Sequence, residues 1–133
     1  MFLPLAYDSG KLQLEPVAGS QTIVKGDALI WSSGYVAVAS STTEDVYAIA
    51  MQDSSSAAEG TSILVLPVEG VRFEVGCDAV VSIVDRGTRC DLATKATVNP
   101  DAITEKVFLI DEIVGAAEVS TTVRGFFSRF TAT

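Results

Sequence analysis

The stretch "VKGDALIWSSGYVAVAS", from Val24 to Ser40, contains two short apolar runs on either side of a Ser-Gly turn. Apolar runs flanking such a turn are typical of a β-hairpin. A similar stretch, "EVGCDAVVSIVDRGTRCDLAT", runs from Glu74 to Thr94. The sequence therefore predicts that one hairpin-containing motif occurs twice in a chain of 133 residues.

The segments that follow each hairpin also keep the same order. We align the segment that opens at Gly26 with the one at Gly76, and the turn at Gly34 with the turn at Gly87. The second copy is longer, because it carries a predicted loop at Thr94–Thr104. Each motif alone is too small to bury its apolar face, so we expect the two to pack together. The later matches are "VYAIAM" (46–51) with "VFLIDEI" (107–113), and "GTSILVLPV" (60–68) with "STTVRGFF" (120–127).

Short β-rich runs dominate the chain, and "DLATKA" and "DEIVGAAEV" are the segments that suit a helical turn or two. We expect an all-β fold, a compact β-barrel or sandwich built from two similar β motifs, with an extended N-terminal arm and at most short helices. The expected boundaries are 1–10 for the arm and 11–133 for a single β domain, with motif one at about 20–70 and motif two at about 71–127. The predicted strands are Lys11–Val17, Ala28–Trp31, Tyr35–Ala39, Val46–Met51, Ser62–Val68, Val71–Val75, Ala79–Val84, Arg89–Leu92, Val107–Ile113 and Thr121–Phe127.

Composition argues against two classes of partner. The chain has 17 acidic and 9 basic residues, and its formal net charge is -8. Because the basic residues are scattered, we expect no nucleic-acid partner. No apolar run reaches the roughly 18 residues of a membrane helix, so we expect no membrane partner. The start, "MFLPLAYDSG", has no basic region and is interrupted by Pro4, so we expect synthesis in the cytoplasm without a signal peptide.

The residue types of common catalytic and metal sites are scarce. The sequence has no histidine, which removes the commonest general base and zinc ligand. Cys77 and Cys90 are too few for a disulfide framework. We favour two buried, inert thiols, and a bond between them stays an alternative. No Walker loop or GxGxxG motif occurs, so we expect neither catalysis nor a cofactor.

Acidic residues provide two weaker candidates. The pairs Glu44-Asp45 and Asp111-Glu112 adjoin or lie in predicted strands. Strand neighbours point to opposite faces, so neither pair is expected to converge as an acid–base dyad. The second candidate is a calcium site, but the spacing of its three acids is not that of an EF-hand, and we expect no metal there. Those acids are Asp78, Asp85 and Asp91.

Both ends of the chain carry apolar side chains. "MFLPLAY" places Phe2, Leu3, Leu5 and Tyr7 on a proline-stiffened segment before the first motif. This arm either folds back on the barrel or docks on another subunit or on a partner's sheet edge. We favour docking, so these four residues are the candidate partner-binding residues.

At the other end, "VRGFFSRFTAT" contains three phenylalanines. Phe126 and Phe127 are adjacent, so one of them faces away from the core if the segment is a strand. We therefore take the three as candidate subunit contacts: Phe126, Phe127 and Phe130.

Taken in order, the motifs resemble those of small decoration, or cement, proteins of tailed-phage capsids. In that family a Gly-Asp pair opens a strand, here Gly26-Asp27, and a strand like Val46–Ala50 follows. A small-residue loop ending in glycine comes next, here Ser54–Gly60, and a strand then runs into Glu69-Gly70-Val71. The resemblance covers roughly residues 24–127.

The resemblance implies a compact β-barrel-like protein, commonly a homotrimer, on the outside of an expanded capsid. Its partners would be the major capsid protein and further copies of itself, and its location the outer surface of the virion. There it would hold neighbouring capsomers together, a structural role and not an enzymatic one. The candidate residues of the arm would then contact the capsid.

Two alternatives accompany this interpretation. The first is another virion module built from β-domains, such as part of a tail, fibre or baseplate. The second is a small carbohydrate-binding module, since Trp31 and Tyr35 are of the type that stacks on sugars. For Trp31, however, we favour a place in the core or in a subunit contact.

Overall fold

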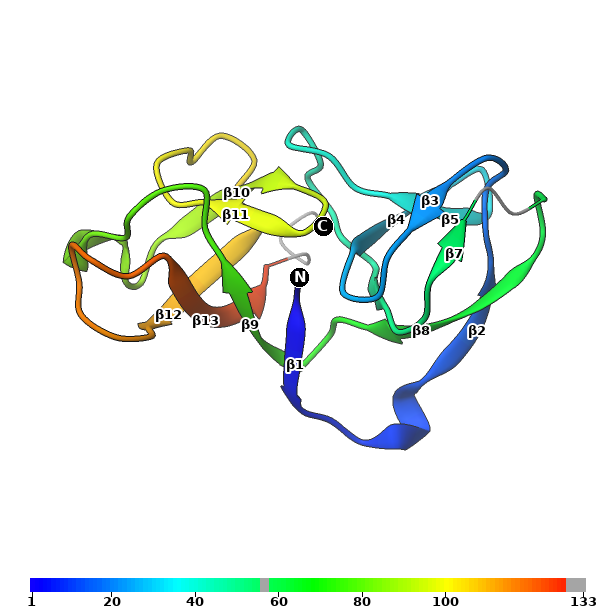
Figure 1. Ribbon diagram of the computed structural model, residues 1–133, viewed down its shortest axis with the longest axis horizontal. Helices are drawn as coiled ribbons and strands as arrows, with labels where there is room; N and C mark the ends of the chain where they lie inside the picture. The colour runs from blue at the N-terminus through cyan, green and yellow to red at the C-terminus, as the bar shows by residue number, and fades with distance from the viewer. Residues whose placement is uncertain (56–57, 129–133) are drawn as a thin grey trace.

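The computed structural model describes residues 1–55 and 58–128. In Figure 1 the strands form two lobes side by side, with the N-terminal strand between them. The strands make three sheets, and two short 3-10 turns complete the regular structure of the described residues. The all-β class with at most short helices is therefore confirmed.

The largest sheet has six strands in the order β1-β9-β13-β12-β10-β11, and the next has five in the order β2-β8-β6-β4-β5. A two-stranded sheet pairs β3 with β7. The bounds in the first sheet are β1 Leu3–Ala6, β9 Arg72–Gly76, β13 Thr122–Phe127, β12 Phe108–Ile113, β10 Arg89–Thr94 and β11 Thr97–Asn99. The others are β2 Gln13–Pro16, β8 Ser62–Pro67, β6 Ala48–Ala50, β4 Ala28–Ser32, β5 Tyr35–Val38, β3 Thr22–Ile23 and β7 Ser54–Ser55, with 3-10 turns η1 Ser9–Lys11 and η2 Ile83–Asp85.

The two large sheets contain the predicted repeat. We call residues 13–68 unit one and residues 72–128 unit two. The order β2-β8-β6-β4-β5 of unit one is matched strand for strand by β9-β13-β12-β10-β11 of unit two. Individual hydrogen bonds repeat as well: Val17 donates its N–H to the Thr61 carbonyl at 2.9 Å, and Cys77 donates to the Thr121 carbonyl at 2.8 Å. Strand β1 has no counterpart in unit one, so it is an addition to the repeat.

The alignment of the second copy needs correction. Gly26 donates to the Ala50 carbonyl at 2.8 Å, and the equivalent donor is Gly87, to the Ile110 carbonyl at 2.7 Å. Both glycines have positive φ, 95° and 87°, which glycine adopts without the steric cost that a Cβ would bring. Gly26 therefore corresponds to Gly87, and not to Gly76 as we expected.

Two predicted elements change as a result. Ala79–Val84 is not a strand: Val81 bonds instead to the 116–120 loop, as donor to the Ser120 carbonyl and acceptor from the Glu118 N–H, and η2 follows. The predicted loop at Thr94–Thr104 contains β11, which pairs with β10 and supplies the true hairpin of unit two. Turn Ser33-Gly34 of unit one thus corresponds to Lys95-Ala96.

Each unit closes on itself. In unit one a parallel bridge joins Val17, just after β2, to Val36 of β5; in unit two the equivalent bridge joins Cys77 to Val98 of β11. These bridges connect the first strand of each sheet order to the last. Each unit is therefore a small five-stranded barrel, which leaves few open edges.

The apolar core has two parts. One cluster fills unit one, with Leu29, Ala48 and Val65 among its fully buried members. The larger cluster joins the interior of unit two to the outer face of unit one, so that Ile49 and Leu66 belong to the same core as the phenylalanines of unit two. The two barrels therefore share one apolar cluster.

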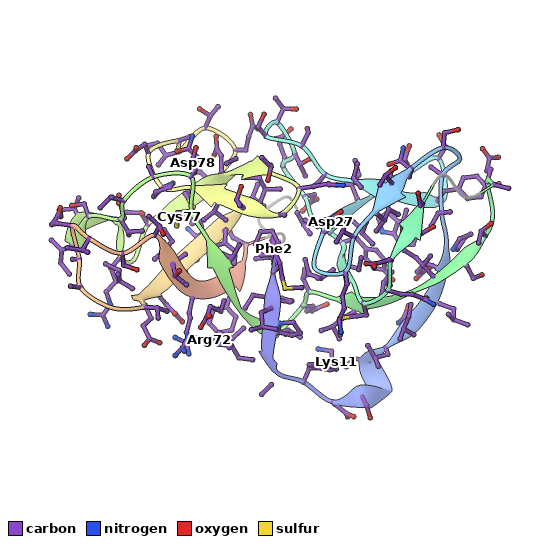
Figure 2. The ribbon with its side chains drawn as sticks, in the orientation of Figure 1. Phe2, Lys11, Asp27, Arg72, Cys77 and Asp78 are labelled. Atoms are coloured by element: carbon purple, nitrogen blue, oxygen red, sulfur yellow. The ribbon has the colours of Figure 1, made fainter. Side chains whose placement is uncertain are left out.

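Phe2 is part of this larger cluster, which corrects its assignment as a partner-binding residue. The side chain is 1% exposed, and its ring lies 4.9 Å from Phe127, 5.9 Å from Phe108 and 6.4 Å from Phe73, centroid to centroid. Figure 2 places it between the lobes. The arm folds back on the second unit, because β1 is a strand of its sheet and Phe2 packs into its core.

We predict that Phe2→Ala lowers the free energy of unfolding by about 3–5 kcal/mol, because it removes a fully buried ring and leaves a cavity. The matched control is Leu3→Ala, which truncates a side chain that is 47% exposed. We expect that control to cost less than about 1 kcal/mol. Urea unfolding followed by circular dichroism measures both; equal midpoints for the two variants would contradict the placement of Phe2.

Candidate functional site

The outward face of the N-terminal strand is the first candidate site. Leu3, Leu5 and Tyr7 are 47%, 38% and 39% exposed, although the segment is ordered against β9. Residues alternate in a strand, so Phe2 and Pro4 turn inward while Leu3 and Leu5 turn outward. β1 is also an end strand of its sheet, so within the described residues no strand pairs with its other edge.

The arm is held at its beginning by the junction of the two units. The Phe2 N–H donates to the Gly26 carbonyl at 2.9 Å, and the Met1 amine donates to the Ala96 carbonyl at 2.7 Å. Burial lowers the pKa of that amine, and the nearby Asp27 carboxylate opposes this effect. The exposed apolar side chains therefore stand on a fixed strand, and not on a free tail.

The predicted C-terminal contacts divide as the alternation of a strand requires. Phe127 is 7% exposed and belongs to the core, so its assignment to a subunit contact is corrected. Phe126 faces out at 36% exposure and lies opposite Leu109 of β12. Phe130 lies outside the described residues. Phe126 is thus the candidate contact that the structure leaves on the surface.

Trp31 lies on the surface and not in the core. It is 50% exposed, and its ring stacks on Tyr47 with centroids 4.3 Å apart and an interplanar angle of 29°. The Tyr47 hydroxyl donates to the Glu15 carboxylate at 2.6 Å and lies 3.1 Å from Oε1, the side-chain amide oxygen of Gln13. An exposed indole beside polar groups is suited to a protein contact or to stacking on a sugar. The carbohydrate-binding alternative stays a prediction, and binding of glycans that is lost in Trp31→Ala is its test.

A cluster of charges covers the outer face of unit two, and our sequence reasoning missed it. Arg72 Nη2 lies 2.8 Å from Asp111 Oδ1 and 2.7 Å from Glu112 Oε1. Arg124 pairs with Glu74 at 3.0 Å and with Glu112 at 3.5 Å. The register of β12 and β13 shifts between Ile110 and Glu112, which is why two adjacent acids contact one arginine and do not point to opposite faces.

This cluster lacks the electrostatics of an acid–base dyad. The hydrogen bonds to Asp111 and Glu112 raise the pKa of Arg72, and the bond from Arg72 lowers the pKa of Glu112. The Glu112 carboxylate, which is paired with two arginines, therefore stays ionised at neutral pH, whereas one carboxyl of a dyad must be protonated. The cluster is therefore suited to holding β9, β12 and β13 together.

The acids proposed for calcium serve the backbone instead. Asp91 accepts hydrogen bonds from the N–H groups of Glu105 and Lys106 at 2.7 and 2.9 Å, and Asp85 accepts from Ser82 at 2.9 Å. The remaining acid, Asp78, is exposed (Figure 2). Across residues 1–55 and 58–128, no group of three or more His, Cys, Asp or Glu residues is arranged to hold a metal ion.

Both cysteines are free thiols; Cys90 is buried, as expected, whereas Cys77 is only partly buried. Burial is the main cause that raises the pKa of Cys77 and of Cys90 to about 12, and nearby acids add to it. Since the thiolate is the reactive form, neither residue has the environment of a nucleophile.

Comparison of the chain with protein-family models, with curated proteins and with solved structures finds no match. In the described part of the chain no helix has the length and apolar character needed to cross a membrane. The candidate site therefore rests on the geometry above: an exposed apolar strand, a surface tryptophan and Phe126.

We predict that Cys77 and Cys90 resist modification by Ellman's reagent at pH 8 in the folded protein and react within seconds in guanidinium chloride. Raised thiol pKa values stabilise the folded state below pH 9, the ordinary thiol value, and this contribution is lost as the pH rises from about 9 to about 12. Thermal melts between pH 8.5 and 11 should therefore decline less steeply for Cys90→Val than for the unchanged protein. Rapid labelling of the native protein would contradict the buried-thiol assignment.

Proposed function

We propose that this protein is a structural component of a phage particle that binds the outer surface of the capsid and holds neighbouring capsomers together. The resemblance of its motifs to those of capsid decoration proteins supports this role. Gly26-Asp27, which carries that resemblance, immediately precedes β4 and helps to join the two units. We propose no catalytic step for the protein.

The single observation that carries the proposal is the ordered edge strand β1. Its outer edge is open to an extended segment of a partner, with backbone carbonyls and, except at Pro4, N–H groups, and the exposed Leu3 and Leu5 side chains can fill pockets of that partner. Exposed apolar residues on a fixed edge strand also favour aggregation, so proteins normally cover or charge such edges. A capsid protein that pairs with β1 would cover this one.

We also propose that three copies of the protein associate on the particle, as the resemblance implies. Three-fold contacts bury apolar surface in a closed arrangement, and Phe126 and Trp31 are exposed aromatic residues suited to such contacts. An electron-microscopy map of particles with and without the protein tests both the location and the copy number. Density on the tail and none on the head would favour the other virion module.

We predict that the double variant Leu3→Glu, Leu5→Glu binds capsids at least tenfold more weakly, because each apolar anchor contributes about 1–3 kcal/mol. The melting temperature should change little, since both side chains face solvent in the free protein. Co-sedimentation with capsids assembled without the protein measures the binding.

The matched control for this prediction is Leu14→Glu, on the edge strand β2 of unit one. Leu14 is 67% exposed, so the variant adds a glutamate, one where the double variant adds two, to an exposed position on an end strand of the other sheet. We expect it to bind capsids as the unchanged protein does. Equal loss of binding in Leu14→Glu, or full binding by the double variant, would exclude β1 as the capsid contact.

A further inference from the structure

The junction between the two units is built around the hairpin turn of unit two. Lys95, the first residue of the β10–β11 turn, rests on the start of β4 in unit one. The Ala28 N–H donates to the Lys95 carbonyl at 2.7 Å, and Lys95 Nζ lies 2.9 Å from the Asp27 carboxylate and 2.9 Å from the Thr22 carbonyl. Asp27 is 2% exposed, so this contact is fully desolvated on one side. A hairpin tip of one unit thus docks on the first residues of a strand of the other.

Because the units are repeats, the docked hairpin and the strand start that receives it each have an equivalent in the other unit. These two equivalents do not contact each other within the chain. The equivalent of the Lys95 turn is the β4–β5 turn at Ser33-Gly34, and both residues are exposed. The equivalent of residues 26–28 is the segment from Gly87 to Arg89. That segment lines a depression of about 220 Å³ together with Ile103 and Lys106.

The strand registers match at this second position. Ala28 lies opposite Ile49 of β6, and its N–H points away from β6 to reach Lys95. Arg89 lies opposite Leu109 of β12 in the equivalent register, so its N–H is directed away from β12 toward the depression. A hairpin tip seated there would accept this hydrogen bond as Lys95 accepts the one from Ala28.

The unused pair cannot form within one molecule. If a two-fold axis related the two units, their contact would be isologous, and each hairpin would dock on the other unit at the same time. Instead one hairpin is docked, while Ser33 and Ile103 both stay exposed, the latter at 59%. The junction is therefore heterologous. Its two unused surfaces, the β4–β5 hairpin tip and the depression of unit two, are left free to contact another molecule.

We infer that the β4–β5 hairpin tip of one copy docks in the unit-two depression of a second copy of this chain, so that copies join head to tail. The contact repeats between molecules the geometry that joins the two units within one. The depression contributes two cations and an isoleucine, from Arg89, Lys106 and Ile103. The hairpin contributes Trp31, whose exposed ring suits a cation–π contact with either cation.

This contact is weaker than its template for an identifiable reason. Thr88 stands where unit one has the buried Asp27, and Ser33 stands where unit two has Lys95, so the buried ion pair is absent. We therefore expect an association that is transient in dilute solution and that a surface carrying several copies strengthens by raising their local concentration. The inference does not depend on the proposed capsid role, since it concerns copies of this chain alone.

Cysteine cross-linking of the purified protein tests the contact. The variant Ser33→Cys, Arg89→Cys places a thiol on each side of it, and mild oxidation should give a series of covalent multimers. A one-to-one mixture of the two single variants has one complete pair of thiols per two molecules, so it should give heterodimers and stop there. The unchanged protein, whose thiols are protected, should give neither. The inference would be overturned if the double variant stayed monomeric. It would also be overturned if the mixture gave only homodimers of each single variant and no heterodimer.

A charge substitution distinguishes the docking site from random collision. Ile103→Glu, added to the cross-linking variant, should reduce the multimer yield at least fivefold, because it places a charge in the depression. The matched control is Ile83→Glu: Ile83 is 58% exposed and lines a different depression with Arg86 and Glu112. Equal yields from the two variants would contradict a specific site at residues 87–89, and circular dichroism of both confirms that they fold.

Discussion

The packing of Phe2 among the phenylalanines of unit two is the contact on which the architecture depends. Unit one fills its own barrel with small and medium aliphatic residues, such as Ala48, Ala50 and Val65. Unit two has the ring of Phe108 where unit one has Ala48, and its interior shares one apolar cluster with Phe2 and with the outer face of unit one. A barrel of fewer than 60 residues buries too little apolar surface to be stable by a wide margin. The N-terminal strand therefore belongs to the core of the second barrel, and it ties both halves into one cooperative structure.

The repeat could be read from the sequence because turns and alternating apolar residues are local signals. Ser33-Gly34 marked the first hairpin correctly, and most strands followed from β-branched runs. The second copy was aligned wrongly because "AVVSIV" is as apolar as a strand, although it has no partner strand and pairs with a loop. β11 was missed because its last residue, Asn99, and the following Pro100 are of types common in turns, which hid a three-residue strand.

The candidate site shows the same division between local and long-range information. Alternation alone placed Phe126 and Phe127 on opposite faces, and the structure adds which face is the core. The burial of Phe2 depends on a strand that follows it by about 70 residues, and nothing in "MFLPLAY" encodes that partner. The arginine bridge to Asp111 and Glu112 needs a shift in register that no pattern in the sequence marks. The sequence shows that these strands carry opposite charges, but it does not show that the strands are neighbours.

The pairing of β1 with β9 also has a consequence for how the chain reaches this structure. Leu3 lies opposite Glu74, so β1 cannot pair with β9 until the chain between them has been synthesised. Unit one, whose strands pair among themselves, is able to form during that interval. The N-terminal segment must meanwhile stay exposed, with Phe2, Leu3 and Leu5 unprotected. Closing the loop of about 70 residues between β1 and β9 costs chain entropy, and such long-range pairing slows folding.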